Sequence, residues 1–146
     1  MAQRIIKFRG KHIETGEWIY GSLLVWPDGK AMIYDTLLTD GNMGGHEVIP
    51  NTISQYTGLT DKYGNGVYEG DIVKRHCRAY GLDDIGVVKY DDEKARFVLY
   101  CKERHYAKSL SFLKQETIND GQCTIEETFT YEIIGNIHDN PKFKDD

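Results

Sequence analysis

Hydrophobic and polar residues alternate in short segments along this chain of 146 residues. Such segments predict β-strands, because successive side chains of a strand point to opposite faces of a sheet. Turn signals rich in Gly, Pro, Asn and Asp separate the segments about every 8–12 residues, a spacing typical of antiparallel sheets. The pattern therefore predicts a mostly β, antiparallel protein rather than a fold of alternating strands and helices.

Residues 1–58 are predicted to form an N-terminal β lobe. Within it, the turn Pro27-Asp28-Gly29-Lys30 should join two strands as a hairpin, because proline presets φ and glycine accepts a positive φ. Residues 35–45 become rich in glycine toward their end and predict a flexible loop. The predicted strands are 4–9, 18–26, 31–34, 47–49 and, as an extended segment, 53–57.

Residues 59–146 are predicted to form a second lobe, an SH3-like barrel packed on the first so that the two make one compact unit. Short strands separated by turns over 70–101 suit such a barrel, and the last strand is expected to help close it. One or two helical turns are predicted over 110–118. The predicted strands are 72–79, 85–90, 95–101 and 123–134.

The composition favours a cytoplasmic protein. No apolar run approaches the roughly 20 residues that a membrane helix needs, and the charged amino terminus does not resemble a signal peptide. Three cysteines at wide spacing argue against a disulfide framework. The net charge of −5 disfavours strong nonspecific binding of nucleic acid, because such binding depends on cationic contacts with phosphate.

Five segments, taken in their order along the chain, are distinctive as a combination. They are Ile6–Gly10, Gly16–Gly21, Gln55–Gly64, Tyr68–Val73 and Ile133–Pro141. Together they resemble the YopX family of small phage and prophage proteins. The resemblance implies a phage or prophage origin and a mostly β fold, and it implies no reaction and no catalytic residue.

His76-Cys77 is the adjacent His–Cys pair of the sequence, and with a further Cys or His it could form a metal site or a Cys-His nucleophile. The further residues in question are Cys101, His105 and Cys123. The sequence lacks the close Cys-x-x-Cys or His-x-x-x-His pairs that mark zinc sites. The alternation places the cysteines on apolar strand faces, so we expect buried thiols that behave as small hydrophobic side chains.

Acidic residues occur in three predicted turns. Asp61–Gly66 lacks the ligands of a calcium loop, because Tyr63 stands at the third position and Ile72 at the twelfth. Asp83-Asp84 and Asp91-Asp92 could bind a hard cation or act as acid and base, but solvated turn residues are the simpler interpretation. We therefore predict no metal, no cofactor and no catalytic residue.

Two groups of residues are candidate binding surfaces. Lys74, Arg75 and Arg78, with Tyr80 nearby, could bind nucleic acid or an acidic partner. Protection of an edge strand would explain these residues equally well. An aromatic group on the predicted hairpin could form a recognition surface or a subunit interface, although packing in the core is the simpler interpretation. Its members are Trp18, Tyr20, Trp26 and Tyr34.

The leading function hypothesis is a phage or prophage accessory protein of unknown biochemical activity that acts as a non-enzymatic interaction module. Its partner would be an unidentified protein or a second copy of the chain, with no membrane involved. The alternative is a small nucleic-acid-binding β-barrel protein. A metal-dependent or hydrolytic enzyme ranks last.

Overall fold

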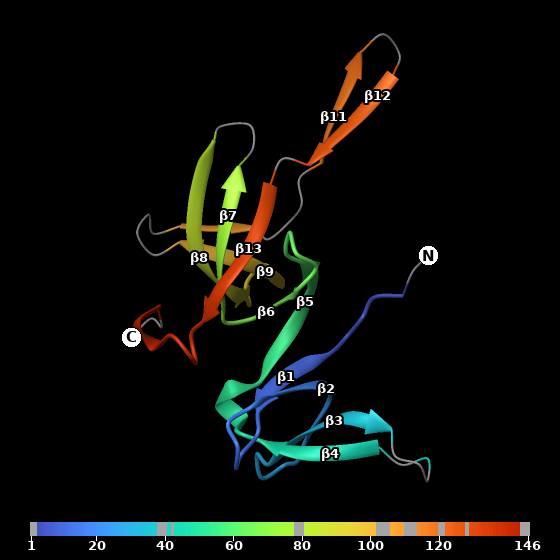
Figure 1. Ribbon diagram of the computed structural model, residues 1–146, viewed down its shortest axis with the longest axis vertical. Coiled ribbons are helices and arrows are strands. Elements are labelled where there is room, and N and C mark those ends of the chain that lie inside the picture. Colours follow the sequence, from blue (N-terminus) through green and yellow to red (C-terminus); the bar gives the residue numbers. More distant parts are fainter. Residues whose placement is uncertain are drawn as a thin grey trace. The chain divides into compact units, whose positions relative to one another are not determined.

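Strands dominate the fold in the computed structural model (Figure 1). The structure describes residues 3–37, 41, 43–77, 81–101, 106–109, 114–119, 122–127 and 129–143. In these residues helix is limited to two short 3-10 turns, Pro50–Thr52 and Pro141–Phe143, and no helix is long and apolar enough to cross a membrane. The strands pair antiparallel, so the predicted mostly β, antiparallel fold is confirmed. The chain divides into two compact units, Met1–Gly58 and Leu59–Asp146.

The strands of unit 1 form an antiparallel sheet in the order β4-β3-β2-β1-β5, and β5 runs on across the boundary into unit 2. They are β1 (Phe8–Lys11), β2 (Trp18–Val25), β3 (Ala31–Leu37), β4 (Met43–Val48) and β5 (Ser54–Thr60). The predicted turn between β2 and β3 is confirmed. In it, the Gly29 amide donates to the Trp26 carbonyl at 2.9 Å, and the Lys30 amide donates to the Asp28 carboxylate at 3.0 Å.

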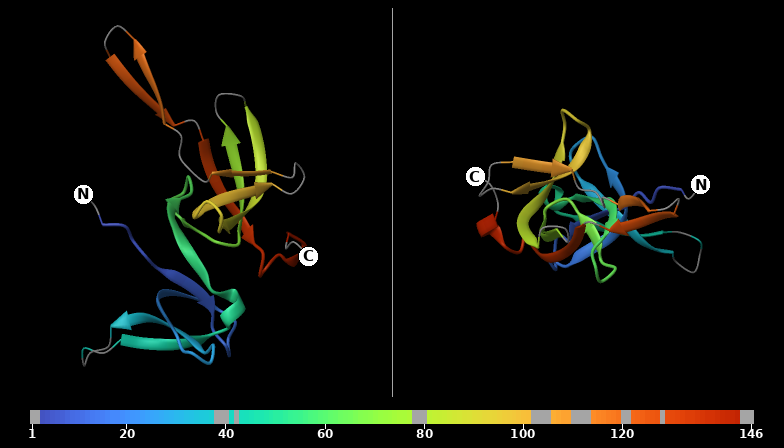
Figure 2. Two further views of the ribbon diagram at one scale, coloured as in Figure 1. Left: turned by 180° about the vertical axis from the view of Figure 1, so that it is seen from behind. Right: turned by 90° about the horizontal axis from the view of Figure 1, so that it is seen from above.

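The sheet of unit 1 curls until the end of β1 reaches the end of β4, and Figure 2 shows the curl in two further views. His12 and Val48 form a bridge there, and the Ile49 amide donates to the Lys11 carbonyl at 2.8 Å. The curl encloses a small apolar core, which is the main favourable contribution to the stability of this unit. The core residues are Ala31, Ile33 and Val48, with Phe8, Ile19, Leu23 and Ile53 packed against them.

Unit 2 contains a second antiparallel sheet in the order β10-β9-β8-β7-β13 and a separate hairpin of β11 with β12. Its strands are β6 (Gly66–Tyr68), β7 (Asp71–Cys77), β8 (Leu82–Asp91), β9 (Arg96–Cys101), β10 (Tyr106–Ser109), β11 (Lys114–Asn119), β12 (Gln122–Glu127) and β13 (Phe129–Asn136). In the described residues β10 and β13 are the two edge strands of an open sheet, and no closed barrel is found. The SH3-like barrel therefore stays a prediction.

One face of this second sheet carries the core of unit 2. The core residues are Val67, Val73, Val88, Leu99, Cys101 and Tyr131, with Phe129 and Ile133 packed against them. Tyr131 lies opposite Arg75 in the β13–β7 register and is almost fully buried. Because side chains alternate along a strand, the residues between these core positions point to the other face of the sheet.

Segments far apart in the sequence meet where β6, β7 and the end of β13 come together. The Asp71 carboxylate accepts a hydrogen bond from the Tyr68 amide at 2.8 Å, which closes the turn between β6 and β7. The Ile137 amide donates to the Gly70 carbonyl at 2.9 Å. Asn136 lies opposite Asp71 in the register and its side-chain oxygen caps the turn that follows β13. Asp71 and Asn136 thus fix the turn before β7 and the turn after β13.

Two predictions for the last third of the chain are wrong. The helical turns expected over 110–118 do not form at residues 114–118, because these belong to β11 and pair with β12. The branched side chains of Thr117 and Ile118 favour a strand, and the Asp-Gly step before Gln122 favours a hairpin. The single strand expected over 123–134 is instead divided between β12 and β13, which belong to different sheets.

The limits of two segments in unit 1 also differ from the prediction. β1 begins at Phe8 rather than at residue 4, and β3 and β4 extend from both sides into the loop expected over 35–45. The glycines of β4 permit close packing within a strand pair. A Cβ atom on Gly45 would lie 2.6 Å from the Tyr34 ring, so glycine is required where that ring crosses β4.

Gly86 provides a test of packing in the sheet of unit 2. A Cβ atom at this position would lie 2.6 Å from the Tyr100 carbonyl oxygen and 2.9 Å from Leu99 Cγ, and the carbonyl cannot move without disturbing the pairing of β8 with β9. We expect Gly86→Ala to lower the free energy of unfolding in urea by about 1–3 kcal/mol. The neighbouring exposed Ile85 provides the control, and Ile85→Thr should change it by no more than about 0.5 kcal/mol. Equal effects of the two substitutions would contradict this account.

Candidate functional site

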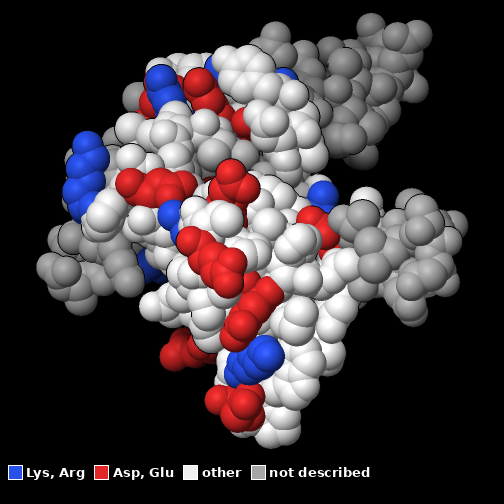
Figure 3. All heavy atoms as spheres, turned by 60° about the horizontal axis from the view of Figure 1, so that its bottom comes forward, with Lys and Arg blue, Asp and Glu red and all other residues white. Residues whose placement is uncertain are grey.

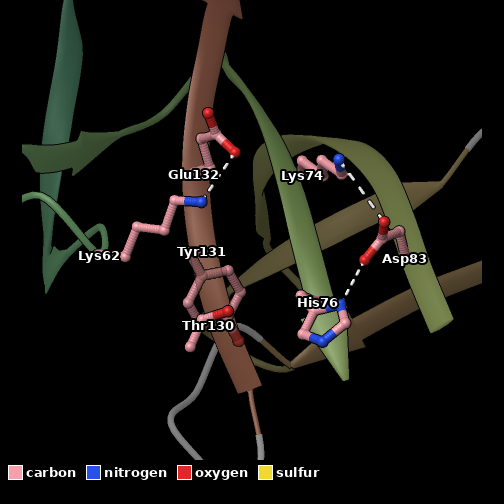
Figure 4. Close-up of a pocket in the computed structure, with 7 residues that line it drawn as sticks. All are labelled: Lys62, Lys74, His76, Asp83, Thr130, Tyr131 and Glu132. Atoms are coloured by element: carbon pink, nitrogen blue, oxygen red, sulfur yellow. Dashed lines mark hydrogen bonds and ion pairs between the residues drawn. The ribbon is translucent and has the colours of Figure 1, made fainter. Parts of the chain in front are cut away.

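A hollow of about 270 Å³ lies on the outer face of β13, β7 and β8 in unit 2 (Figure 4). Its lining residues are Lys62, Lys74, His76, Asp83, Thr130, Tyr131 and Glu132. The strand register places Thr130 opposite His76, and His76 opposite Asp83, in one row across the three strands. Glu132 lies opposite Lys74 in the next row. The hollow is therefore a direct product of strand alternation and register.

Lys62 reaches the hollow from the turn between β5 and β6. Its backbone amide donates to the Tyr131 carbonyl at 2.8 Å, which fixes the turn against the edge of β13. Asp61 strengthens this attachment, because its carboxylate accepts hydrogen bonds from the amides of Tyr63 at 3.0 Å and Asn65 at 2.8 Å. The Ile133 amide also points at this carboxylate, at 3.5 Å.

The buried Asp61 carboxyl has a lowered pKa. Burial acts most strongly and would raise the pKa, but the hydrogen bonds from the backbone and side chain of Asn65 and from the amides of Tyr63 and Ile133 together outweigh it. Asp61 is therefore a charged anchor that holds Lys62 beside β13. This structural role belongs to the Asp61–Gly66 turn, which lacks the ligands of a calcium loop.

Oppositely charged side chains alternate across the hollow, as Figure 4 shows. Lys62 Nζ lies 3.2 Å from Glu132 Oε2, and Lys74 Nζ lies 3.5 Å from Asp83 Oδ2. His76 Nδ1 lies 2.5 Å from Asp83 Oδ1. The hydrogen bond from His76, aided by the charge of Lys74, lowers the pKa of Asp83, and the hydrogen bond to Glu132 raises the pKa of Lys62. The side chains of these two lysines and two carboxylates are 34–43% exposed to solvent, so these pairs contribute little to stability.

The His76–Asp83 pair has the orientation found in a catalytic triad, in which the carboxylate binds Nδ1 and leaves Nε2 for a nucleophile. Thr130 is the adjacent hydroxyl, but no hydrogen bond joins it to His76 among the described residues. The side chains of His76 and Asp83 are 47% and 43% exposed, and nothing in this arrangement excludes water. Within the described ranges, no three His, Cys, Asp or Glu side chains are grouped to hold a metal ion.

The structure separates the basic residues that the sequence placed together. Lys74 points into the hollow, whereas Arg75 points to the opposite face of β7 and is only 3% exposed. Its guanidinium donates to the Asp84 carboxylate at 2.7 Å and lies over the Phe129 ring at 4.6 Å. Arg78 and Tyr80 lie outside the described residues. Binding of nucleic acid through these residues stays a prediction.

The acidic pairs have different surroundings. Asp83 and Asp84 lie in β8, so the prediction that they occupy a turn is wrong. Because consecutive strand residues point to opposite faces of the sheet, the two carboxylates have different partners. Asp91 ends β8 and its carboxylate accepts a hydrogen bond from the Glu93 amide at 3.1 Å, as expected for a turn residue.

The expected burial of a thiol is confirmed for Cys101, which packs in the core of unit 2 beside Leu99. His105 and the side chains of Cys77 and Cys123 lie outside the described part of the chain. Of the residues considered as partners of His76, Cys101 is thus placed in the core, on the opposite face of the sheet from His76.

The aromatic group of unit 1 lies largely on one face of the β2–β3 hairpin. Trp18 and Tyr20 are two positions apart in β2 and therefore lie on the same side of the strand. Tyr34 lies opposite Ser22, which is on that side too. Trp26 stands beyond the end of β2, with Lys30 Nζ 5.7 Å from its ring. We refer to Trp18, Tyr20, Leu24 and Tyr34 as the aromatic face.

Residues of β1 cover the Trp18 ring. Arg9 Cζ lies 4.5 Å and Lys11 Nζ lies 5.3 Å from the centre of that ring, both within the range of cation–π attraction. Tyr20 and Leu24, by contrast, are each 47% exposed. The aromatic face therefore combines a ring held by cations with two exposed apolar side chains.

A model of the family described as YopX protein matches residues 7–143, nearly the whole chain. The chain belongs to the YopX family. The crystal structure of protein yopX from Bacillus subtilis is similar over 98% of this chain and 100% of that chain, with 15% sequence identity and a TM-score of 0.57. At this identity the likeness shows a common fold. A search of curated proteins found no match.

The segments that carry the YopX resemblance have clear structural roles in this chain. Gln55–Gly64 contains Asp61, which binds the turn to β13, and Tyr68–Val73 contains Asp71, which closes the turn before β7. Ile133–Pro141 contains Asn136, which caps the turn after β13. In this YopX-family protein Asp61 thus fixes the turn beside the hollow, and Asp71 and Asn136 fix the turns at the other end of the β7–β13 pair.

Breaking the buried ion pair should be far more costly than breaking the exposed one beside it. We expect Asp84→Ala to lower the free energy of unfolding by about 3–5 kcal/mol, because Arg75 would remain buried without this carboxylate. Asp83→Ala removes the exposed partner of Lys74 and should cost no more than about 1 kcal/mol. Urea unfolding of both variants tests the difference, and similar losses would show that the two faces of β8 do not differ as described.

The lowered pKa of Asp61 predicts how stability depends on pH. Its ordinary value is 3.8, and a lower value in the folded state means that ionised Asp61 stabilises the fold above about pH 4. That contribution is lost as the pH falls through the folded-state pKa. We expect Asp61→Asn to lose less stability than the wild type between about pH 5 and about pH 3 in urea unfolding. The exposed Asp92→Asn should retain the wild-type pH dependence, and a parallel curve for Asp61→Asn would contradict the assignment.

Proposed function

We propose that this YopX-family chain is a phage or prophage accessory protein that acts by binding a protein partner rather than by catalysis. The observation that carries the proposal is the aromatic face of unit 1, where Tyr20 and Leu24 expose nearly half of their surface on one side of β2. Large apolar side chains exposed together are typical of surfaces that associate with another protein. A partner from the same phage or its host, or a second copy of this chain, would cover them.

The surroundings of the aromatic face support a binding surface with a defined shape. Trp18 is packed by Arg9 and Lys11, and Tyr34 packs against Gly45 without space for a further carbon atom. Rings held in this way lose little conformational entropy when a partner binds. Trp and Tyr are also the residues that most often dominate the energy of protein interfaces.

A protein partner suits this face better than a nucleic acid does. Binding of single-stranded nucleic acid uses open ring faces for stacking with bases, whereas the Trp18 ring already has Arg9 and Lys11 over it. The chain carries a net charge of −5. On the face shown in Figure 3, Lys and Arg occur in scattered groups among more prominent Asp and Glu side chains. That view shows no continuous basic track of the kind that binds phosphates.

The test replaces the two exposed apolar side chains together. Purified wild-type chain is first examined by size-exclusion chromatography with light scattering for self-association, and then used to capture partners from host cells that carry the phage. We expect Tyr20→Ser with Leu24→Ser to weaken binding of the purified partner, or of a second copy, by at least about tenfold, as expected for truncation of central apolar contacts.

The matched control is Ile13→Ser, which removes a side chain that is 50% exposed in the turn after β1. It should leave binding unchanged. The proposal is contradicted if the wild type is monomeric and captures no specific partner, or if the double variant binds as tightly as the control. Circular dichroism of each variant checks that the sheet is retained.

A further inference from the structure

The hollow of unit 2 contains hydrogen-bond donors that its own ion pairs do not use. His76 gives Nδ1 to Asp83, which leaves Nε2 on the other edge of the ring within the hollow. The Thr130 hydroxyl faces the same space and makes no hydrogen bond with the described residues. Lys62 has three N–H donors, of which one points to Glu132 and a second interacts with the Tyr63 hydroxyl, which leaves the third for a ligand. Figure 4 shows these three side chains around one opening, on β7, β13 and the turn before β6.

The sign of the charge in the hollow depends on His76. Two lysines and two carboxylates face His76, and their formal charges cancel. They are Lys62 from the β5–β6 turn, Lys74 on β7, Asp83 on β8 and Glu132 on β13. Histidine is the side chain whose charge commonly changes between about pH 5 and 8. The hollow is therefore neutral when His76 is neutral and carries one positive charge when His76 is protonated.

Protonation of His76 also completes the set of donors. Neutral His76 donates Nδ1–H to ionised Asp83, so its Nε2 is then an acceptor and opposes an anion. Protonated His76 keeps the bond to Asp83 and donates from Nε2 as well. Asp83 is thus a positioning residue, because its hydrogen bond with Nδ1 holds the ring of His76 in the hollow. The donors stand on three different elements, the β5–β6 turn, β13 and β7, an arrangement suited to an anion with several separated oxygens such as a tetrahedral one.

We propose that this hollow is a binding site for a tetrahedral oxyanion, either inorganic phosphate or a phosphate monoester, held by Lys62, Thr130 and protonated His76. Charged donors on a phosphate oxygen form the stronger class of hydrogen bonds, and lysine is a common phosphate ligand. The volume of about 270 Å³ leaves space for a group attached to the phosphate. This site lies in unit 2 and is independent of the aromatic face of unit 1.

The first experiment uses sulfate, because its two charges do not change between about pH 6 and about pH 8. Sulfate is titrated into the ¹⁵N-labelled full chain at constant ionic strength, and amide shifts are followed by NMR. We expect saturable shifts centred on residues 62, 76 and 130, with affinity at least about fivefold higher at the lower pH, as one added positive charge at contact distance should give. Shifts spread over the surface, or no saturable binding at the lower pH, would overturn the proposal.

Substitutions in the hollow separate a built site from general charge attraction. Lys62→Gln and His76→Gln should each weaken sulfate binding at least about fivefold at the lower pH, and His76→Gln should also remove the pH dependence. Thr130→Val should weaken binding without changing the pH dependence. Glu132→Gln removes a carboxylate that opposes the anion and should strengthen binding, an effect that unfolding cannot produce.

The control for charge is Lys94→Gln, which removes one exposed cation of unit 2 from the β8–β9 turn, away from the residues that line the hollow. It should change the affinity less than about twofold, since exposed charges at a distance are screened by salt. A loss as large as that of Lys62→Gln would show that the binding is general charge attraction and would overturn the site.

A last experiment compares inorganic phosphate with glycerol 3-phosphate. Tighter binding of the ester assigns the site to a monoester, and equal or weaker binding assigns it to the free ion.

Discussion

The antiparallel pairing of β13 with β7 is the interaction on which the rest of unit 2 depends. It places residues about sixty positions apart in the sequence side by side, from Phe129 opposite Cys77 to Asn136 opposite Asp71. One face of this pair buries Val73 and Tyr131 in the core, where removal of apolar surface from water drives folding. The other face carries the charged residues of the hollow. Core and candidate site are thus two sides of one strand pair, and a shift of register by one residue would exchange them.

The same alternation explains why neighbouring charged residues have unequal roles. Arg75 and Asp84 point inward, where a short hydrogen bond at 2.7 Å compensates two buried charges. Lys74 and Asp83, each one position earlier in the chain, point outward into solvent. A buried pair is costly to break and an exposed pair contributes little, so the inward pair preserves the fold and the outward residues remain available to bind a ligand.

Unit 1 uses its sheet differently. Its curl gathers Ala31, Ile33 and Val48 into a small core, and aromatic side chains remain on the outer side of β2. The aromatic face of unit 1 and the charged hollow of unit 2 thus differ in chemistry, and the two proposals above assign them different kinds of ligand. In unit 2, Asp61 and Asn136 of the YopX-like segments fix the turns next to β13.

The sequence by itself determined the local structure. Alternation and turn residues identified the β2–β3 hairpin, the β8–β9 hairpin and the mostly β class, because these depend on contacts between near neighbours. It failed at β11, where the pattern of a short segment did not distinguish helix from strand, and it grouped Lys74 with Arg75 although they point apart. Only the tertiary structure brought Lys62, His76 and Thr130 together, because their proximity depends on the register between strands distant in sequence. Alternation could have placed Thr130 and Glu132 on a polar strand face. No local sequence pattern, however, predicts that β7 is the strand paired with them.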